Sequence, residues 1–454
     1  MWAKPLIKDS INRYLFLNIL IMKQLFRFSV MLLALLLPAL ATAADFVVDD
    51  ICYNINGNEA AVTRKGLPGF LFIGYSGPVV IPATVTYNGI TYPVTSIEAL
   101  AFYRCTELTS IDIPNSVTEI GQEAFANCPG LTSIVVESGN PRFDSRNNCN
   151  AIIETTDNTL IAGCKNTIIP NSVTKIGNFA FERCGSLTSI VIPNSVTSIG
   201  HYAFYCCDSL TSVDIPNSVI EIGYGVFESC FGLTSIVVES GNPRYDSRNN
   251  CNAIIETAYN TLIYGCKNTM IPNSVTTIDD YAFYDCDGLT SIVIPNSVTE
   301  IGFGAFESCT GLTSIVIPNS VTSIGDGAFC NCWRLTDVYC YIADLSKVSS
   351  GNRTFYSNNH ASYLGRTLHV LQGTADAYRA DENWYPYFGQ IVEDIIMGDV
   401  NRDLEVNIAD VNAAIDIILG GNSSSIAADV NGDGEINIAD INAVIDIILS
   451  GTGN

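Results

Sequence analysis

The chain has few basic residues and very few histidines. Its 454 residues include 22 lysines and arginines against 46 aspartates and glutamates, giving a formal net charge of −24, and only three histidines. Because nucleic acids and anionic lipids bind to basic surfaces, this charge argues against both as partners. The histidines, His201, His360 and His369, are too few and too scattered to indicate a zinc or catalytic site.

Long hydrophobic runs are also scarce, and the one that stands out lies near the N-terminus. Lys23 and Arg27 precede an apolar stretch over residues 28–40, and Ala41-Thr42-Ala43 fits the small-residue rule for cleavage. We therefore expect residues 1–43 to be an N-terminal extension and signal peptide, with Met22 favoured over Met1 as the start. A membrane anchor is the alternative, but the apolar core is short for a span.

The motifs of common enzymes are missing as well. The chain contains no G-x-S-x-G, no H-E-x-x-H and no P-loop. A carboxylate pair for glycoside hydrolysis stays open, but six glutamates recur at equivalent positions of a repeat, which is typical of a solvated face. These are Glu119, Glu221, Glu300, Glu182, Glu228 and Glu307. We predict no catalytic residues and no enzyme activity.

What the chain does have is a repeat. The pentapeptide Ile-Pro-Asn-Ser-Val recurs at intervals of 23 or 56 residues, and a fixed period of this size indicates a solenoid. Alternating Leu and Ile before the proline predict a strand, Asn-Ser predicts a turn, and Ala-Phe-x-x-Cys predicts a tight helical turn. The prolines of the motif are Pro114, Pro170, Pro193, Pro216, Pro272, Pro295 and Pro318.

The longer intervals contain extra residues. Residues 135–173 and 237–275 are near copies, and we interpret their additional residues as a hairpin that protrudes from the coil, with turns near Asn158 and Asn260. Cys149 and Cys164, and likewise Cys251 and Cys266, fall on opposite arms of these hairpins, so either a disulfide or free thiols fits them. Eight further cysteines share one repeat position, where a column of buried thiols is favoured over disulfides. They are Cys105, Cys128, Cys184, Cys207, Cys230, Cys286, Cys309 and Cys332.

A second, different repeat lies near the C-terminus. Residues 399–410 return as residues 429–440, and each copy places oxygen side chains at the spacing of a calcium-binding loop. Apolar residues at helical spacing follow each loop. Leu404 stands where Gly434 makes the sharp turn of the second loop, so we expect the first of the two Ca2+ sites to be weaker. The predicted ligands are Asp399, Asn401, Asp403, Glu405, Asn407 and Asp410, and Asp429, Asn431, Asp433, Glu435, Asn437 and Asp440.

Both repeats resemble known families. The 23-residue unit resembles the leucine-rich repeats of BspA-like bacterial surface proteins, which implies a β-rich solenoid of the α/β horseshoe type with short helical turns. The loop-then-helix pair resembles the type I dockerin module of cellulosome-type proteins, which implies a small all-α, EF-hand-like module. By these resemblances we expect an N-terminal β cap over residues 44–93, the solenoid over 94–338, a C-terminal cap over 339–396 and the dockerin module over 397–454.

The dockerin resemblance also implies a partner, the cohesin module of a scaffold protein. The helix that begins at the last loop residues carries cohesin recognition in dockerins. The residues expected to contact cohesin are therefore Ile408, Ala409, Asn412 and Asp416 in the first copy, and Ile438, Ala439, Asn442 and Asp446 in the second.

Together these features predict a secreted or surface-associated bacterial recognition protein. Polar Thr, Ser and Asn ladders with aromatic substitutions would bind a protein or glycan ligand on the solenoid, as in an adhesin. An accessory or hydrolytic role in polysaccharide breakdown is the alternative, because most dockerins are modules of glycoside-active proteins. A third possibility is a structural surface-layer component that self-associates. The aromatic positions are Tyr202, Tyr205, Tyr224, Phe231, Tyr281, Tyr284, Phe303 and Trp333.

Overall fold

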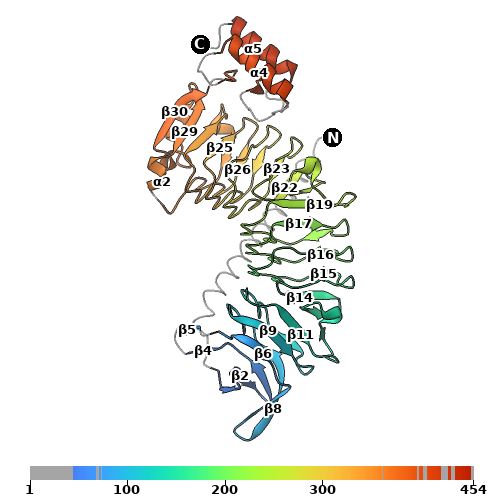
Figure 1. Cartoon of the computed structure of the whole chain (residues 1–454). Helices are drawn as coiled ribbons and strands as arrows, with labels where there is room; N and C mark the ends of the chain where they lie inside the picture. The colour runs from blue at the N-terminus through green and yellow to red at the C-terminus, as the bar shows by residue number, and fades with distance from the viewer. Residues whose placement is uncertain are drawn as a thin grey trace, which may run out of the picture.

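The chain folds into an elongated, curved stack of coils that ends in two short helices (Figure 1). This computed structural model describes residues 44–67, 71–72, 74–359, 361–395, 398–401, 406–420, 428–430 and 435–450. The predicted extension and signal peptide, residues 1–43, lie outside the described residues. No helix in the described ranges is long and apolar enough to cross a membrane.

The first described strands close one end of the stack. β1 (Phe46–Val48), β2 (Ile51–Asn56) and β3 (Glu59–Val62) are antiparallel, and β3 then pairs in parallel with β8 (Ile90–Ile97). Asp49 and Asp50 take positive φ angles and form the turn between β1 and β2. β7 (Thr84–Tyr87) folds back on β8, and β4 (Gly66–Leu67) pairs with β5 (Leu71–Phe72).

Most regular coils contribute one longer and one shorter strand, which pair in parallel with their equivalents in neighbouring coils; residues 187–192 and 289–294 take the place of a longer strand without forming one. Because the repeat period is constant, equivalent residues pair: Ser133 lies opposite Ser110, and Ser235 lies opposite Ser212. The longer strands are β6 (Gly77–Val80), β9 (Leu108–Ile113), β11 (Ser133–Val136), β17 (Ser212–Ile215), β19 (Ser235–Val238), β25 (Ser314–Ile317) and β27 (Asp337–Cys340). The shorter strands are β10 (Glu119–Ile120), β15 (Lys175–Ile176), β16 (Ser198–Ile199), β18 (Glu221–Ile222), β23 (Thr277–Ile278), β24 (Glu300–Ile301), β26 (Ser323–Ile324) and β28 (Ser349–Ser350).

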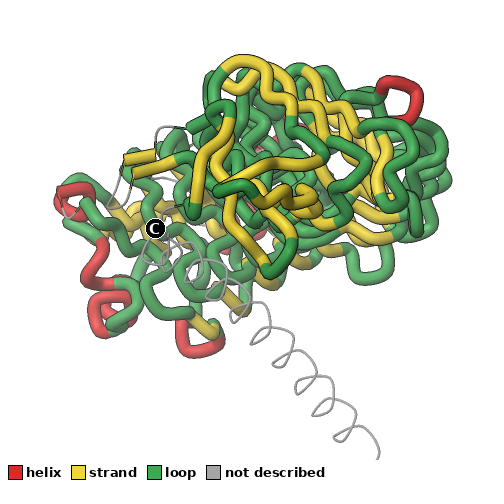
Figure 2. Tube along the Cα trace, turned by 90° about the horizontal axis from the view of Figure 1, so that it is seen from below, coloured by secondary structure: helices red, strands yellow, loops and turns green. Residues whose placement is uncertain are grey.

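The segment around Ala-Phe-x-x-Cys consists of consecutive hydrogen-bonded turns. Leu100 and Arg104, with φ angles of 61° and 60°, interrupt any helical run, since left-handed residues cannot continue a right-handed helix. The N–H of Phe102 donates to the carbonyl of Ala124 in the next coil at 2.8 Å. The turns therefore link successive coils as the strands do, and in Figure 2 loop and strand account for nearly all of the solenoid.

The two extra segments are hairpins, as the sequence predicts, but they do not protrude. In the first, β12 (Phe143–Asp144), β13 (Ala151–Glu154) and β14 (Thr159–Gly163) are antiparallel, and β14 continues the ladder of short strands by pairing with β15. Ile153 and Leu160 are fully buried. The second consists of β20 (Tyr245–Asp246), β21 (Ala253–Glu256) and β22 (Thr261–Gly265), and short 3-10 turns lie within both, at Arg146–Asn148 and Arg248–Asn250. Asn158 and Asn260 take positive φ at the predicted turns.

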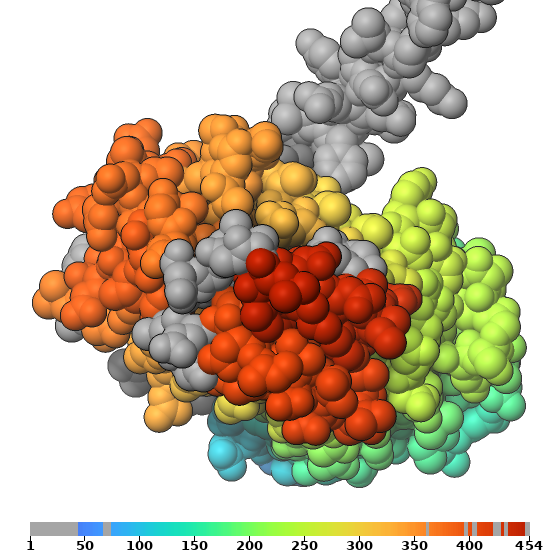
Figure 3. Space-filling view, turned by 90° about the horizontal axis from the view of Figure 1, so that it is seen from above, coloured from blue at the N-terminus to red at the C-terminus, as the bar shows by residue number. Residues whose placement is uncertain are grey.

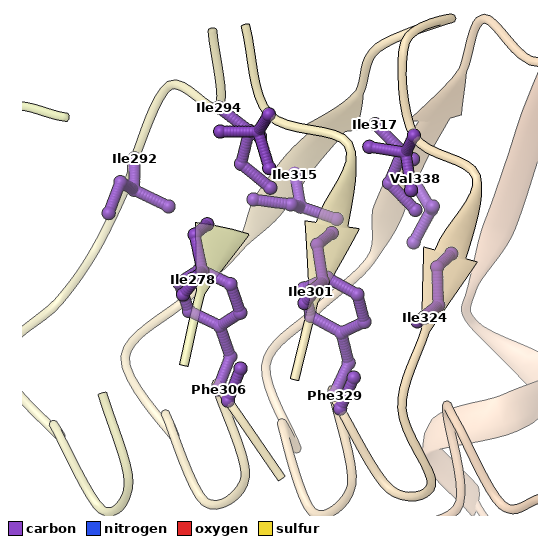
Figure 4. Packing of buried hydrophobic residues seen from close by; sticks show 14 of the residues in the cluster. Ile278, Ile292, Ile294, Ile301, Phe306, Ile315, Ile317, Ile324, Phe329 and Val338 are labelled. Atoms are coloured by element: carbon purple, nitrogen blue, oxygen red, sulfur yellow. The ribbon is translucent and has the colours of Figure 1, made fainter. Parts of the chain in front are cut away.

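Stacked apolar side chains fill the interior of the coils. Ile278, Ile301 and Ile324 lie side by side on successive short strands, above Phe306 and Phe329 (Figure 4). The rings of Phe306 and Phe329 are stacked with centroids 5.3 Å apart. Such continuous rows bury the apolar side that a single coil would leave exposed.

The cysteines belong to this interior as thiols. All sixteen lie in the described part of the chain, and all are free there. Cys149 packs in the core segment that contains Phe181, whereas Cys164 packs in the segment that contains Phe125, so their thiols face different coils. In the column the thiol donates to a phenylalanine carbonyl one coil earlier, for example Cys128 to Phe102 at 3.0 Å. The same bond joins Cys207 to Phe181, Cys230 to Phe204, Cys309 to Phe283 and Cys332 to Phe306.

The last coils end in a mixed layer. β29 (Thr367–Leu371) and β30 (Gln390–Ile395) extend the long-strand ladder from β27. Between them, α3 (Ala375–Ala380) carries the buried Tyr378, and the fully buried Trp384 follows the helix. Short segments complete this end: 3-10 turns at Leu345–Lys347 and Tyr385–Tyr387, and α2 (Ala361–Leu364). α4 (Ile408–Gly420) and α5 (Ile438–Ser450) then pack against each other.

Candidate functional site

The first acidic loop is closed by its last residue. Asp410 accepts hydrogen bonds from the N–H groups of Val400 at 2.7 Å and Asn401 at 3.0 Å, and from Asn407 at 2.9 Å. In the second copy, Asp440 accepts from the N–H of Asn437 at 2.9 Å. The residues that begin and end the first loop are thus brought together, as a cation-binding loop requires.

Both ends of each loop carry a buried carboxylate. Asp399 and Asp429 are each 4% exposed, and Asp410 and Asp440 are fully buried. Burying carboxylates is costly unless cations or hydrogen bonds compensate their charge. Four such groups in so small a module fit a hard cation with oxygen ligands, and these residues would hold Ca2+ at the two ends of each loop.

The structure describes only some of the remaining predicted ligands. Asp403, Glu405, Asn431 and Asp433 lie outside the described residues, as do Leu404 and Gly434. Asn401 and Glu435 are described and exposed. No cluster of three or more His, Cys, Asp or Glu side chains that could hold a metal occurs in the described ranges, which omit the middle of both loops. The twelve ligand assignments therefore stay predictions.

Asn407 and Asn437 have a role that the loop pattern does not reveal. The side-chain oxygen of Asn407 accepts from the N–H of Ala409 at 2.8 Å, and that of Asn437 accepts from Ala439 at 2.7 Å. Each asparagine therefore caps the N-terminus of the helix that follows, α4 or α5. Asparagine directly before a helical apolar pattern is the signal from which this role could have been predicted.

The eight residues expected to contact cohesin are all exposed. Ile408, Asn412 and Asp416 are spaced at four residues, so they lie on one face of α4. Leu419 extends this face by a further turn and is 80% exposed. On α5, Ile438 and Leu449 are exposed in the same way. The two leucines were missed because apolar helix residues are normally assigned to the core.

The opposite faces of α4 and α5 form a small core of their own. Val411 and Ala414 of α4 pack with Val444 of α5, and Val400 and Ala428 belong to the same cluster. Figure 3 shows the two helices (red) as a lobe above the coils of the C-terminal half. The side-chain amide of Asn296, in a turn of the solenoid, donates to Asp429 in the second loop.

The face of the solenoid that carries the longer strands has a ladder with one residue from each coil, and all of these residues except the half-buried Val316 and Tyr339 are exposed. Val191 is 81% exposed and Ile168, its equivalent in the inserted coil, is 73% exposed. This face is therefore largely apolar at the position that was expected to form part of a polar strip. The ladder consists of Val80, Asp112, Val135, Ile168, Val191, Asp214, Val237, Met270, Val293, Val316 and Tyr339.

The predicted aromatic row lies elsewhere, on the turns, and its rings contact one another. Tyr202 is buried and stacks on Phe179, with centroids 5.5 Å apart. Tyr281 contacts Tyr224 and Phe303. Tyr202 is therefore not a binding residue, and these ring contacts occupy much of the row.

Two of the repeated glutamates are also not on a solvated face. Glu182 and Glu228 are buried, whereas Glu119, Glu221 and Glu300 are exposed. Of the histidines, His201 accepts from the N–H of Tyr224 at 2.9 Å, and His369 lies between Asp394 and Asp337 at 2.6 and 3.2 Å. His360 lies outside the described residues.

Stacked parallel coils and a pair of loop–helix units define a leucine-rich-repeat protein with a C-terminal calcium-loop module. The family described as BspA type leucine rich repeat region matches in six copies, over residues 84–153, 157–259 and 252–363. The dockerin type I domain matches residues 397–449. The chain therefore belongs to the BspA-type leucine-rich-repeat family and carries a type I dockerin, a calcium-binding kind of module.

The chain is similar to several solved bacterial structures. A leucine rich cell surface protein from Faecalibacterium prausnitzii is 24% identical, with 70% of this chain and 96% of that chain covered and a TM-score of 0.42. The pneumococcal vaccine antigen PcpA is 18% identical over 78% and 100% of the two chains, with a TM-score of 0.43. A leucine-rich repeat protein from Eubacterium ventriosum is 22% identical over 72% and 77%, with a TM-score of 0.40. No curated protein matches this chain.

Proposed function

We propose that this protein is an exported, non-catalytic recognition protein whose solenoid binds a partner while its dockerin attaches it, through two Ca2+ ions, to a cohesin on a scaffold. The observation that carries the docking half is the pair of exposed helix faces that follow two loops with buried terminal aspartates. Ile408 and Ile438 are 67% and 72% exposed at the start of these faces. Exposed isoleucines next to polar residues fit an interface with an apolar centre and a polar rim.

The near identity of the two helices supports docking in either of two orientations related by a half-turn. Asn412 and Asp416 on α4 correspond to Asn442 and Asp446 on α5, and all four are exposed. A cohesin that uses one helix as its main contact would meet nearly the same surface on the other. Either Ca2+ loop would then support binding, because each positions the start of one helix.

For the solenoid we propose a protein ligand on the largely exposed ladder of the face that carries the longer strands. Contiguous exposed apolar residues are uncommon on monomers and mark interaction surfaces. Val80, Ile168, Val191 and Met270 are its most exposed apolar members. Asp112 and Asp214 interrupt the ladder and would discriminate among ligands by charge. A glycan would favour accessible aromatic rings, and the aromatic row is largely occupied by its own contacts.

The docking proposal is tested by calorimetric titration of the full chain with Ca2+, followed by capture of a panel of type I cohesins with Ca2+ or with EDTA. We expect two bound ions and cohesin capture only with Ca2+. The matched control is the double variant Asp399→Ala/Asp429→Ala, which should lose both Ca2+ and cohesin. Absence of Ca2+ binding by the unaltered chain would refute docking through this module.

The ladder is tested separately. The double variant Val191→Glu/Met270→Glu changes two exposed residues, and its control Glu119→Gln/Glu221→Gln changes two exposed residues of the short-strand ladder. Binding of secreted and surface proteins to immobilised wild-type protein should be lost in the first variant and retained in the control. Equal binding by both variants would place the ligand on another face.

A further inference from the structure

Among the differences between the two inserted hairpins, the exchange of Ala162 for Tyr264 changes most the space inside the coil. Ala162 pairs with Ile152 in the first hairpin, and Tyr264 pairs with Ile254 at the same register in the second. The Tyr264 ring packs edge-on against Phe227 with centroids 5.8 Å apart. Its hydroxyl donates to the carbonyl of Gly223 at 2.8 Å and accepts from the N–H of Val226 at 3.1 Å.

With alanine at this position, the first hairpin leaves a cavity of about 190 Å3. The corresponding space beside Tyr264 measures about 20 Å3. Gly121 and Ala124, the equivalents of Gly223 and Val226, line the large cavity, and the N–H of Ala124 reaches the carbonyl of Gly121 only at 3.3 Å. The backbone N–H and carbonyl groups that bond to the hydroxyl of Tyr264 beside the second hairpin are therefore bonded to each other beside the first, at the wall of the cavity.

The walls of the cavity suit an aromatic ring with a polar end. Phe125 and Phe181 line it, and each ring stacks on a phenylalanine only on the side away from the cavity. Glu182, which is 8% exposed, also lines the cavity, and within the described chain its Oε2 atom has no hydrogen-bond partner. A buried acceptor without a partner is costly, and this oxygen makes one end of the cavity wall polar.

Both spaces are lined by carboxyl groups, but at different positions, and Glu228 and Asp285 line the second. Glu182 and Glu123 line the first cavity, and the second hairpin has Tyr284 and Gly225 at the equivalent positions. Burial, together with the nearby charge of Glu123, raises the pKa of Glu182 to about 8. Near neutral pH this carboxyl group can donate or accept a hydrogen bond without carrying a charge.

We propose that the cavity beside Ala162 binds a small phenol, whose ring and hydroxyl take the places that the side chain of Tyr264 fills in the second hairpin. The ring lies between Phe125 and Phe181, and the hydroxyl bonds to the backbone of Gly121 and Ala124. The volume exceeds what one water molecule needs by roughly tenfold. This site is separate from the dockerin and from the exposed ladder, so it does not depend on the function proposed above.

The test uses p-cresol, which reproduces the side chain of tyrosine, and toluene, which lacks the hydroxyl. Titration of the full-length protein should give one bound p-cresol with a dissociation constant on the order of 1 mM or tighter, and weaker binding of toluene. Ala162→Tyr should abolish p-cresol binding and raise the melting temperature. Tyr264→Ala, which opens the second space, should bring the stoichiometry to two.

Two results would overturn the proposal. One is the absence of p-cresol binding to the unaltered protein up to its solubility limit, which would leave the cavity as a site for water. The other is equal binding by the wild type and by Ala162→Tyr, which would put the ligand elsewhere. Ala162→Leu, which fills the space without a hydroxyl, should also lose binding, so the test does not depend on how one variant folds.

Discussion

The carboxylate of Asp410 is bonded to the backbone N–H of Val400, ten residues earlier, at 2.7 Å. This contact closes the first acidic loop directly before helix α4. The last residue of the loop thus serves two purposes: its oxygens are positioned for a cation, and its hydrogen bonds hold the loop against the helix. Metal binding and folding of the module are therefore expected to be coupled.

Removal of Ca2+ should unfold the dockerin and leave the solenoid intact. Without the ion, the buried Asp399, Asp410, Asp429 and Asp440 would repel one another. Calorimetry of the full chain should show a small transition that shifts to lower temperature with EDTA and a larger one that does not. Asp410→Ala should reproduce part of the shift, and Asp416→Ala, at an exposed position, should not. A small transition that EDTA leaves unchanged would contradict the coupling.

Cohesin binding should tolerate loss of either exposed helix face but not of both. Ile408→Asp or Ile438→Asp alone leaves the other face available. Because one of two binding orientations is lost, we expect the dissociation constant to rise about twofold. The double variant should lose at least about 2 kcal/mol, since each isoleucine would be central to its interface. Surface plasmon resonance with one cohesin measures all three. If either single substitution abolished binding, only one orientation would be in use.

The glycine that follows each short strand should be replaceable only where a hairpin precedes it. A Cβ atom on Gly223 would lie 2.5 Å from the backbone nitrogen of His201, whereas one on Gly177 would come no closer than 3.0 Å to any atom. The second hairpin shows the difference, since Asp279 replaces Gly177 at the equivalent position. Gly223→Ala should therefore cost about 1–3 kcal/mol by urea denaturation. Gly177→Ala should cost clearly less, and similar losses would contradict this account.

The repeat period could be predicted in full because it controls the pairing of strands. A constant spacing forces Ser133 opposite Ser110, and the same argument locates the columns of Phe and Cys. The hairpin turns at Asn158 and Asn260 were predicted from their residue types. For the acidic loops, the spacing of oxygen side chains was enough to indicate the module, whose family match covers residues 397–449.

What could not be predicted depends on neighbours rather than on the repeat itself. The number of extra residues does not reveal whether a hairpin protrudes from the solenoid or packs within it. The burial of Ile153 shows that the first hairpin packs within it. Glu182 follows the phenylalanine of its repeat unit, but the coil before it has no turn at this position, so Glu182 faces a cavity. Leu100 and Arg104 take left-handed conformations that neither residue type favours, because hydrogen bonds to the next coil impose them.

Burial of Glu182 should make the solenoid less stable as the pH rises. Its pKa is raised to about 8 in the folded chain, from an ordinary value near 4.5, so the folded state holds the proton more tightly. Between these two values the unfolded chain binds fewer protons, and stability falls with increasing pH. Each unit of difference in pKa corresponds to about 1.4 kcal/mol in the free energy of unfolding. The charged groups that face the carboxyl group of Glu182 are Glu123 and Arg183, and the Nε of Arg183 lies 3.5 Å from the Oε1 of Glu182.

Glu182→Gln removes this titration and keeps the shape of the side chain. Its stability relative to wild type should therefore increase from pH 5 to about pH 8 and then level off, because both states of the wild type are ionised above that point. Glu221→Gln, at an exposed position in the short strand β18, provides the control and should follow the wild type. Urea denaturation of the three proteins across this range decides the matter. Parallel curves for wild type and Glu182→Gln would mean that the carboxyl group is already ionised, with Arg183 as its counterion, near pH 5.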